Sequence, residues 1–413
     1  MSVRFPSPSS RVLLVQLPSL GVTMFNRITA TPKTYAWGST TALPQLLGVA
    51  PDGSPQAELW MGAHPDSTTY ILDPHAGQPA TLNEWIATQP EAALGERTRL
   101  PFLFKILAAA KPLSLQAHPS LERAREGYVE ENRRGAPRDA PDRNYKDEWH
   151  KPELIVALAD GFQALCGFRA IDQSLKLLQH LAAPADARPS ILIEGFRDQL
   201  ENVGIEPTVR AVLTRQPATL VRALVGASRS NDSQVWAAEA QLLLSLDKCY
   251  PGDQGIAIAA LLNFVSLRKN EALFLPAGNI HAHVAGLGVE IMAASDNVVR
   301  GGLTSKNIDV PELLRVLDFR PTRVPYVKPV TRVDGFVEYH VPVSDFQLMR
   351  ADAGTTVNFI PNESAVVFAT TGSTTVTQGS NVWVLKQGEA AYIAPGTVPF
   401  LLKSEGDTFI ATS

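Results

Sequence analysis

The segment Asn270-Glu-Ala-Leu-Phe-Leu-Pro-Ala-Gly278 decides the fold, because a similar segment stands near the end of the chain. The later segment reads Gly388-Glu-Ala-Ala-Tyr-Ile-Ala-Pro-Gly396. Each copy begins at a turn, continues as a short apolar strand and ends at a turn that contains proline and glycine. Internal similarity of this kind indicates a duplicated structural unit, so we expect two β-sandwich units.

The two copies differ in the residues that come directly after them. The first continues into Ile280-His-Ala-His283, and the second continues into Thr397-Val-Pro399, which offers no metal-binding side chain. The strand-and-turn pattern itself is typical of cupin-type jelly rolls. We therefore expect the first unit to hold any metal and the second unit to be structural.

Between the two β regions the periodicity changes from that of strands to that of helices. Apolar residues recur at spacings of three and four in Ile171–Leu181 and in Ile193–Val203, and Gln234–Leu246 has one apolar face. This pattern predicts amphipathic helices, and several prolines separate them. A helical block therefore interrupts the strands.

The predicted fold is mainly β with an α-helical insertion, built from two cupin-type jelly-roll β-sandwich units plus a helical domain. Residues from 24 to about 168 read as short strands and turns, for example at Thr69–Leu72 and Phe102–Leu107. The expected organisation is a disordered extension at 1–23, a catalytic cupin-type domain at 24–168 and 263–325, a helical insertion domain at 169–262, and a metal-free cupin-like domain at 326–413.

The composition narrows the classes of function. The 413 residues are 45% hydrophobic and 19% charged, as in ordinary globular proteins. Lys and Arg number 37 against 41 Asp and Glu, without a long basic stripe, so nucleic acid is not an expected partner. The apolar run Val12–Val15 is too short to span a membrane. Cys166 and Cys249 lack CxxC spacing, which favours reduced thiols in the cytosol.

Several side chains could converge on a divalent metal. Gln116 and His118 are two residues apart, so on a strand they would face the same side, and His281 and His283 have the same spacing. Glu153 could add a carboxylate. A donor set of imidazole, carboxylate and amide oxygen without thiolate suits Zn²⁺, with Mn²⁺, Fe²⁺ and Co²⁺ also possible. From the residues alone, either His281 or His283 could be the ligand.

Basic and hydroxyl residues cluster in the same segments as these candidate ligands. Lysine and arginine can clamp a phosphate dianion, and serine can donate one more hydrogen bond. The glycine-rich loops of nucleotide-binding proteins are absent from the sequence, so nucleotide binding has no support. The residues that could hold an anion are Lys105, Ser114, Lys151, Arg300 and Lys306.

Several longer segments are far more specific together than any one of them is alone. They are Tyr35–Gly38, Ala57–Pro65, Phe102–Leu107 with Pro112–Pro119, His150–Leu154 and Glu290–Lys306. In this order, from about residue 24 to 325, they closely resemble type I mannose-6-phosphate isomerases. The resemblance implies a zinc-dependent aldose–ketose isomerase that interconverts D-mannose 6-phosphate and D-fructose 6-phosphate through a cis-enediol.

The resemblance also implies roles, carried over position by position. One zinc ion per chain would be held by Gln116, His118, Glu153 and His281. The catalytic arginine would be Arg300, and the candidates for ring opening and proton transfer would be His150, Lys151 and Asp296. The residues that hold the substrate phosphate would be Ser114, Lys105 and Lys306. The family usually has tyrosine where this chain has His283, so His283 is expected to line the substrate cavity.

The same resemblance implies a cytoplasmic monomer of carbohydrate metabolism that serves GDP-mannose biosynthesis, with a small sugar phosphate and neither nucleic acid nor a membrane as its partner. Two other hypotheses are weaker. An iron dioxygenase of cupin type would carry its carboxylate ligand close to its histidines, whereas Glu153 lies far before His281. A non-catalytic sugar sensor would not need a complete ligand set together with Arg300.

Overall fold

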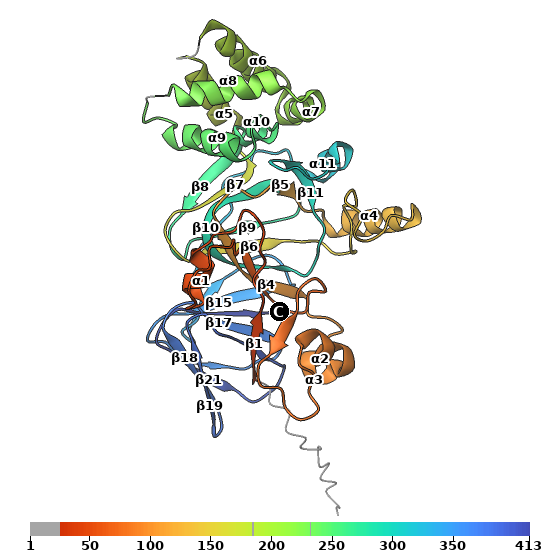
Figure 1. Ribbon diagram of the computed structural model, residues 1–413, viewed down its shortest axis with the longest axis vertical. Coiled ribbons are helices and arrows are strands. Elements are labelled where there is room, and N and C mark those ends of the chain that lie inside the picture. Colours follow the sequence, from red (N-terminus) through yellow and green to blue (C-terminus); the bar gives the residue numbers. More distant parts are fainter. Residues whose placement is uncertain (1–24, 184–185, 232) are drawn as a thin grey trace, which may run out of the picture.

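The computed structural model describes residues 25–183, 186–231 and 233–413. A bundle of helices lies at one end of the molecule, strands lie in the middle, and the strands of the C-terminal segment lie at the other end, with α2 and α3 beside them (Figure 1). The extension expected at residues 1–23 lies outside the described residues. No helix within the described residues is long and apolar enough to cross a membrane.

The central strands are organised by β10 (His281–Ala293). Its first half pairs antiparallel with β5 (Leu115–Ala117) and β7 (Phe162–Phe168). Its second half pairs antiparallel with β4 (Phe102–Ala109) and β6 (Glu153–Ala157), both of which are buried along their whole length. Continuous apolar runs of this kind are typical of strands covered on both faces.

A bend in β10 brings its two ends to the same place. Glu153 pairs with Met292 near the end of β10, yet its carboxylate lies 3.2 Å from His281 at the start. A straight strand would separate those two positions of β10 by roughly 36 Å, too far for one side chain to span. The strand register shifts between His283 and Ala285. The following residue, Gly286, has φ +125°, and a Cβ added to it would lie 2.7 Å from the Cα of Phe162. Only glycine fits this bend.

The remaining strands of this ten-stranded sheet flank those already described. They are β2 (Glu58–Met61) on β4, β8 (Leu262–Leu267) on β7, β9 (Ala272–Leu275) on β6, β11 (Val299–Gly302) on β5, and β12 (Tyr326–Val327) on β9. All of these pairs are antiparallel.

The C-terminal segment adds further short antiparallel strands. They are β13 (Val330–Thr331), β14 (Val337–Tyr339), β15 (Gln347–Ala351), β16 (Thr356–Phe359), β17 (Ala365–Ala369), β18 (Ser373–Gln378), β19 (Asn381–Lys386), β20 (Ala390–Ile393), β21 (Phe400–Ser404) and β22 (Thr408–Thr412). A four-stranded sheet has the order β16-β21-β18-β19. Buried residues such as Phe336, Val367 and Phe400 form one core cluster between this sheet and the larger one.

Strands from both ends of the chain share an eight-stranded sheet. Its order is β13-β14-β15-β22-β17-β20-β1-β3. β1 (Phe25–Ala30) pairs with β20, and β3 (Thr69–Ile71) pairs with β1 on its other side. The earliest described strand therefore completes a sheet that the C-terminal segment builds.

Six helices in the middle of the sequence form the bundle at one end of Figure 1. They are α5 (Ile171–Ala182), α6 (Ala187–Val203), α7 (Ile205–Arg215), α8 (Ala218–Arg229), α9 (Ala237–Cys249) and α10 (Gly255–Ala259). The helices predicted in Ile171–Leu181 and Ile193–Val203 are confirmed, and Leu178 and Leu200 of their apolar faces are buried. Their core continues into strand residues such as Leu165, so the bundle is packed on the central sheet.

The prediction of strands and turns alone for residues 24–168 is wrong. This region also contains α1 (Ala42–Leu46), α2 (Leu82–Thr88), α3 (Pro90–Leu94) and α4 (Leu121–Arg133). α4 has almost no apolar stripe, because the residues on its buried face are Ala124, Gly127 and Glu131, which are small or charged. Its signal is the N-cap, where the Ser120 hydroxyl accepts a hydrogen bond from the backbone N–H of Arg123. A short helix, α11 (Val310–Val316), comes after β11. The described residues are rich in antiparallel sheets, as predicted, but helices cover almost as many of them as strands do, so the fold is less strongly β than expected.

Candidate active site

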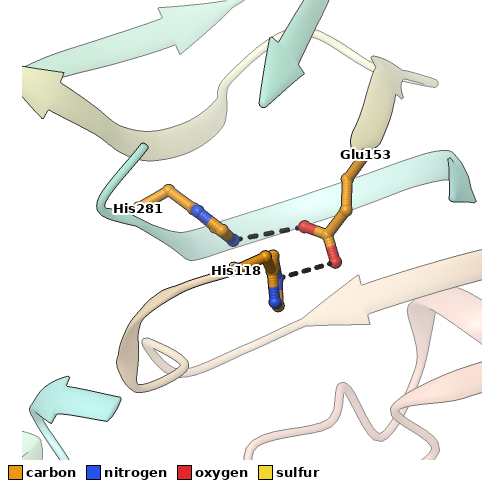
Figure 2. Close-up of side chains that lie close together, drawn as sticks. All are labelled: His118, Glu153 and His281. Carbon is orange, nitrogen blue, oxygen red and sulfur yellow. Dashed lines mark ion pairs between the residues drawn. The ribbon is translucent and has the colours of Figure 1, made fainter. Parts of the chain in front are cut away.

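Three of the predicted metal ligands meet in one buried cluster (Figure 2). Nε2 of His118 lies 3.2 Å from Oε1 of Glu153, and Nε2 of His281 lies 3.2 Å from Oε2 of the same carboxylate. All three side chains are at most 2% exposed. His118 comes directly after β5, Glu153 begins β6 and His281 begins β10. One ligand atom from each residue lies within 4.8 Å of the other two, an arrangement that can hold a divalent ion.

Backbone carbonyls set the orientation of both imidazoles. Nδ1 of His118 lies 2.7 Å from the carbonyl oxygen of Asn297, and Nδ1 of His281 lies 3.0 Å from that of Asn279. A carbonyl can only accept, so each Nδ1 carries the proton and donates it. The lone pair of each Nε2 then faces the carboxylate, which is the form of histidine that binds a metal.

The protonation states and the unpaired atoms of the cluster fit a cation. Nε2 of His118 and Oε2 of Glu153 are buried, and neither has a hydrogen-bond partner among the residues that the structure describes. Burial lowers the pKa of His118 to about 4, so its imidazole is neutral at pH 7. Burial alone would raise the pKa of Glu153, but the neighbouring His118 and Lys151 hold it well below the usual value of a glutamate. Neutral imidazole and ionised carboxylate are the forms that a metal requires.

The fourth predicted ligand, Gln116, lies beside this cluster. It stands opposite His281 of β10 on one side and opposite Arg300 of β11 on the other. Its Nε2 lies 3.4 Å from Nε2 of His281. The two ends of an amide are interchangeable by rotation, so the amide oxygen can take this place and face the cluster.

Two cations near Gln116 have no carboxylate partner within residues 25–183, 186–231 and 233–413. Among the described residues, the side chains of Arg300 and Lys306 form no hydrogen bond or ion pair. Burial lowers the pKa of Arg300, and burial together with the charges of Arg300 and Lys146 lowers the pKa of Lys306. Ser114 is half-buried immediately before β5. Uncompensated positive charge of this kind favours an anionic ligand.

The residues before Glu153 face in different directions. Nζ of Lys151 lies 3.3 Å from Oε1 of Glu153, so Lys151 reaches the metal cluster. The neighbouring His150 does not join the cluster, because its Nε2 lies 3.0 Å from Oδ2 of Asp345, in the loop between β14 and β15. The structure therefore brings Lys151 to the predicted centre and joins His150 to the C-terminal segment.

A second buried group of charges lies next to the metal cluster. Nζ of Lys105 lies 3.6 Å from Glu58 and 3.2 Å from Glu290, and Nε2 of His283 lies 2.9 Å from Glu290. Burial would lower the pKa of Lys105, but the two carboxylates raise it above the usual value of a lysine. Burial would raise the pKa of Glu290, but Lys105 lowers it to about 2. His283 is thus bound to Glu290 and not to the carboxylate that His118 and His281 share.

Asp296 is held by two partners at the rim of the site. Its Oδ1 lies 2.8 Å from Nε2 of His64, and its Oδ2 accepts a hydrogen bond of 2.8 Å from Arg138. Burial would raise the pKa of Asp296, but the hydrogen bond from His64 lowers it to about 2. Of the two histidines without an assigned role, His64 is buried and His75 is exposed.

Sequence reasoning assigned no role to Glu58, Glu290 or Asp345. Glu290 of β10 stands directly opposite Lys105 of β4, and Glu58 of β2 reaches the same lysine from a diagonal position. A lysine that is buried on an apolar strand needs a carboxylate partner. Lys105 in the apolar run of β4 therefore indicated that such partners exist, although not which residues they are. Asp345 has no such signal, because its partner His150 is far away in the sequence.

The fold and the cluster define a class: a protein of antiparallel sheets with a buried histidine–carboxylate metal site. Residues 25–171 match the catalytic domain of phosphomannose isomerase type I, and the chain is 38% identical over 384 residues to mannose-6-phosphate isomerase of Escherichia coli (strain K12), a match that covers 90% of this chain and 95% of that protein. The chain belongs to the type I mannose-6-phosphate isomerase family.

More distant relatives and solved structures agree. The chain is 34% identical over 359 residues to mannose-6-phosphate isomerase of Homo sapiens, covering 77% of this chain and 79% of that one. A crystal structure of mannose 6-phosphate isomerase in its zinc-bound holo form has a TM-score of 0.84 and 34% identity, covering 94% of this chain and 99% of that chain. A variant of phosphomannose isomerase from Salmonella typhimurium gives the same TM-score of 0.84 at 33% identity. The predicted family is confirmed.

Proposed function

We propose that this chain is a zinc-dependent aldose–ketose isomerase that interconverts D-mannose 6-phosphate and D-fructose 6-phosphate. The observation that carries the proposal is the buried cluster of His118, Glu153 and His281 beside Arg300 and Lys306, two cations that no carboxylate in the described part of the chain pairs with. A metal site next to free positive charge suits a phosphorylated substrate whose chemistry needs an electrophile.

One zinc ion per chain would be held by Gln116, His118, Glu153 and His281. The donor set contains nitrogen and oxygen without thiolate, which suits zinc, and a solved relative is described as zinc bound. When bound, zinc would polarise the oxygens on C1 and C2 of the sugar as a Lewis acid.

Isomerisation moves a proton between C1 and C2, and we infer that it passes through a cis-enediol. When one of these carbons loses its proton, negative charge develops on the carbonyl oxygen of the other. The guanidinium of Arg300 would supply a fixed positive charge for that oxygen, and such preorganised charge needs no rearrangement during the reaction. Arg300 is available for this role because no carboxylate among the described residues neutralises it.

Lys151 is our leading candidate for the base that carries the proton. It is buried and reaches the carboxylate of Glu153. A positioned base of this kind contributes ~10²–10⁴-fold to the rate. His150 remains the alternative base and the candidate for ring opening, although its imidazole is bound to Asp345. Asp296 remains a further acid–base candidate, and its ties to His64 and Arg138 favour its ionised form.

The substrate phosphate would be held by Ser114 and Lys306, neither of which has a competing carboxylate partner among the described residues. Lys105 is the third proposed phosphate ligand, but Glu58 and Glu290 already share its ammonium group. Lys105 can therefore hold a phosphate only by giving up one of these carboxylates. His283 would line the substrate cavity with its hydrogen bond to Glu290 in place.

The finer architecture is also part of the proposal. We infer two cupin-type jelly-roll units, with a catalytic domain at 24–168 and 263–325, a helical insertion at 169–262 and a metal-free unit at 326–413. The strong curvature of β10 and two core clusters, each almost wholly within one unit, support this division. A third cluster joins the two units, and β1 and β3 lie in the sheet of the C-terminal unit. We also propose that the protein is a cytoplasmic monomer and that its reaction serves GDP-mannose biosynthesis.

A coupled assay tests the proposed function. Purified protein is given mannose 6-phosphate, and the fructose 6-phosphate formed is measured with and without a metal chelator. We expect conversion that stops on chelation and returns with added zinc. Conversion that continues unchanged in metal-free protein, or no conversion in zinc-loaded protein, would contradict the proposal.

A further inference from the structure

The segment that carries Lys151 is held by Asp345 of the C-terminal segment and by Arg99, which precedes β4. Oδ2 of Asp345 lies 3.0 Å from Nε2 of His150, and the two side chains are only 14% and 24% exposed. Arg99 lies over the ring of the preceding Trp149, with 3.8 Å between its Cζ and the ring centroid. Two successive residues just before Lys151 are therefore each held by a specific partner.

The loop that presents Asp345 is itself anchored. Val341 and Phe346 on either side of Asp345 are buried in one core cluster, which also contains Leu154 and Val156 of β6. A carboxylate between two such anchors has little freedom to move. Asp345 therefore offers a fixed point against which His150 is set.

The geometry of the chain links His150 to Lys151. Pro152 comes directly after Lys151, and a residue before proline is restricted to extended backbone. Side chains of successive residues in extended backbone point in opposite directions. His150 thus meets Asp345 while Lys151 turns to Glu153, with Nζ 3.3 Å from Oε1.

We propose that Asp345 is a positioning residue for the isomerisation: by holding the imidazole of His150, it sets where Nζ of Lys151 lies. This inference rests on the proposed function, in which Lys151 carries the proton. It also gives the metal-free C-terminal unit a part in catalysis, because that unit supplies the carboxylate. A misplacement of about 1 Å can lower the rate about a hundredfold, so a smaller shift of Lys151 should lower it less.

The test compares Asp345→Ala and Asp345→Asn with a matched control in the zinc-loaded full chain. The control is Glu363→Ala, which removes another ion pair between the C-terminal segment and the same neighbourhood, the 2.6 Å contact of Glu363 with Arg97. We expect Asp345→Ala to lower kcat by about tenfold and to leave KM within about twofold. Asp345→Asn should keep more activity, because its amide oxygen still accepts a hydrogen bond from His150. Glu363→Ala should match the unaltered chain.

Two further measurements separate positioning from general stability. In a His150→Ala background, Asp345→Ala should lower kcat no further, because the contact is already gone. Labelling of lysines with acetic anhydride, read by peptide mass spectrometry, should modify Lys151 faster in Asp345→Ala than in Glu363→Ala. Equal kcat in Asp345→Ala and Glu363→Ala would overturn the inference. The inference would also fail if Asp345→Ala lowered kcat as much in the His150→Ala background as it does in the unaltered chain. A zinc-loaded chain without isomerase activity would instead refute the proposed function.

Discussion

The two histidines at the start of β10 should differ sharply when each is replaced by alanine. His281 and His283 are two residues apart, but Nε2 of His281 lies 3.2 Å from the Glu153 carboxylate, whereas Nε2 of His283 lies 2.9 Å from Glu290. We expect His281→Ala to lose zinc and His283→Ala to keep it. The contrast is informative because both residues are buried and chemically identical.

The expected magnitudes can be derived from these contacts. Zinc bound by four protein side chains gains about 10–16 kcal/mol, so removing one ligand should cost on the order of 3 kcal/mol, or about a hundredfold in affinity. His283→Ala removes one hydrogen bond to a buried charge, which should lower the free energy of unfolding by about 1.5–3 kcal/mol. Glu290 keeps Lys105 as a partner at 3.2 Å, which limits that loss.

The assay is equilibrium dialysis of both variants against a zinc buffer, with subsequent metal analysis and thermal unfolding. The expected result is a normal zinc content with a lowered melting temperature for His283→Ala, and a strongly reduced zinc content for His281→Ala. Zinc loss from His283→Ala together with full zinc in His281→Ala would refute the assignment of the ligands.

Three other perturbations have defined outcomes. Arg300→Ala should lower kcat by about a hundredfold or more while zinc stays bound, as steady-state kinetics and metal analysis would reveal; equal loss of both would contradict a role in charge stabilisation. Asp296→Asn should destabilise the protein by about 2 kcal/mol at pH 7, because the pKa of Asp296 is lowered from 3.8 to about 2 on folding. The stabilisation by ionised Asp296 is present above its unfolded pKa and is lost as pH falls from about 4 to about 2. The difference in melting temperature between Asp296→Asn and the unaltered chain should therefore shrink in this range. A difference that does not change with pH would contradict a stabilising ion pair. Gly286→Ala should lower the melting temperature strongly, because a Cβ would lie 2.7 Å from Phe162 at φ +125°; a melting temperature equal to that of the unaltered chain would show that the bend tolerates a side chain.

Local patterns in the sequence predicted the elements whose periodicity is strong. The helices around Leu178 and Leu200 are amphipathic and were found where the spacing of apolar residues placed them. α4 escaped prediction because its buried face consists of Ala124, Gly127 and Glu131, which give no apolar periodicity. Its cap at Ser120 was the better signal.

Pairing between distant segments could not be predicted from local patterns. β1 joins β20, which lies at the opposite end of the sequence. Nothing in the residues of a single strand specifies so remote a partner, because its alternation defines only which face is buried. The same limit applies to Asp345, whose contact with His150 depends on the docking of the C-terminal segment.

The candidate site was predictable in its residue types and only partly in its geometry. The spacing of two residues predicted that Gln116 and His118 face the same side. In the structure Gln116 lies beside His281, and His118 lies beside Glu153. The same spacing could not separate His281 from His283. The bend at Gly286 makes that choice, because it folds β10 so that Glu290 meets His283.

The proposed function requires that side chains from separate strands converge on a single metal ion. Anomalous scattering at the zinc edge from crystals of the zinc-loaded protein would locate this ion. We expect one peak about 2.0–2.2 Å from Nε2 of His118, Nε2 of His281 and the carboxylate of Glu153. A peak bound instead to His283 and Glu290, or no peak in an active crystal, would contradict it.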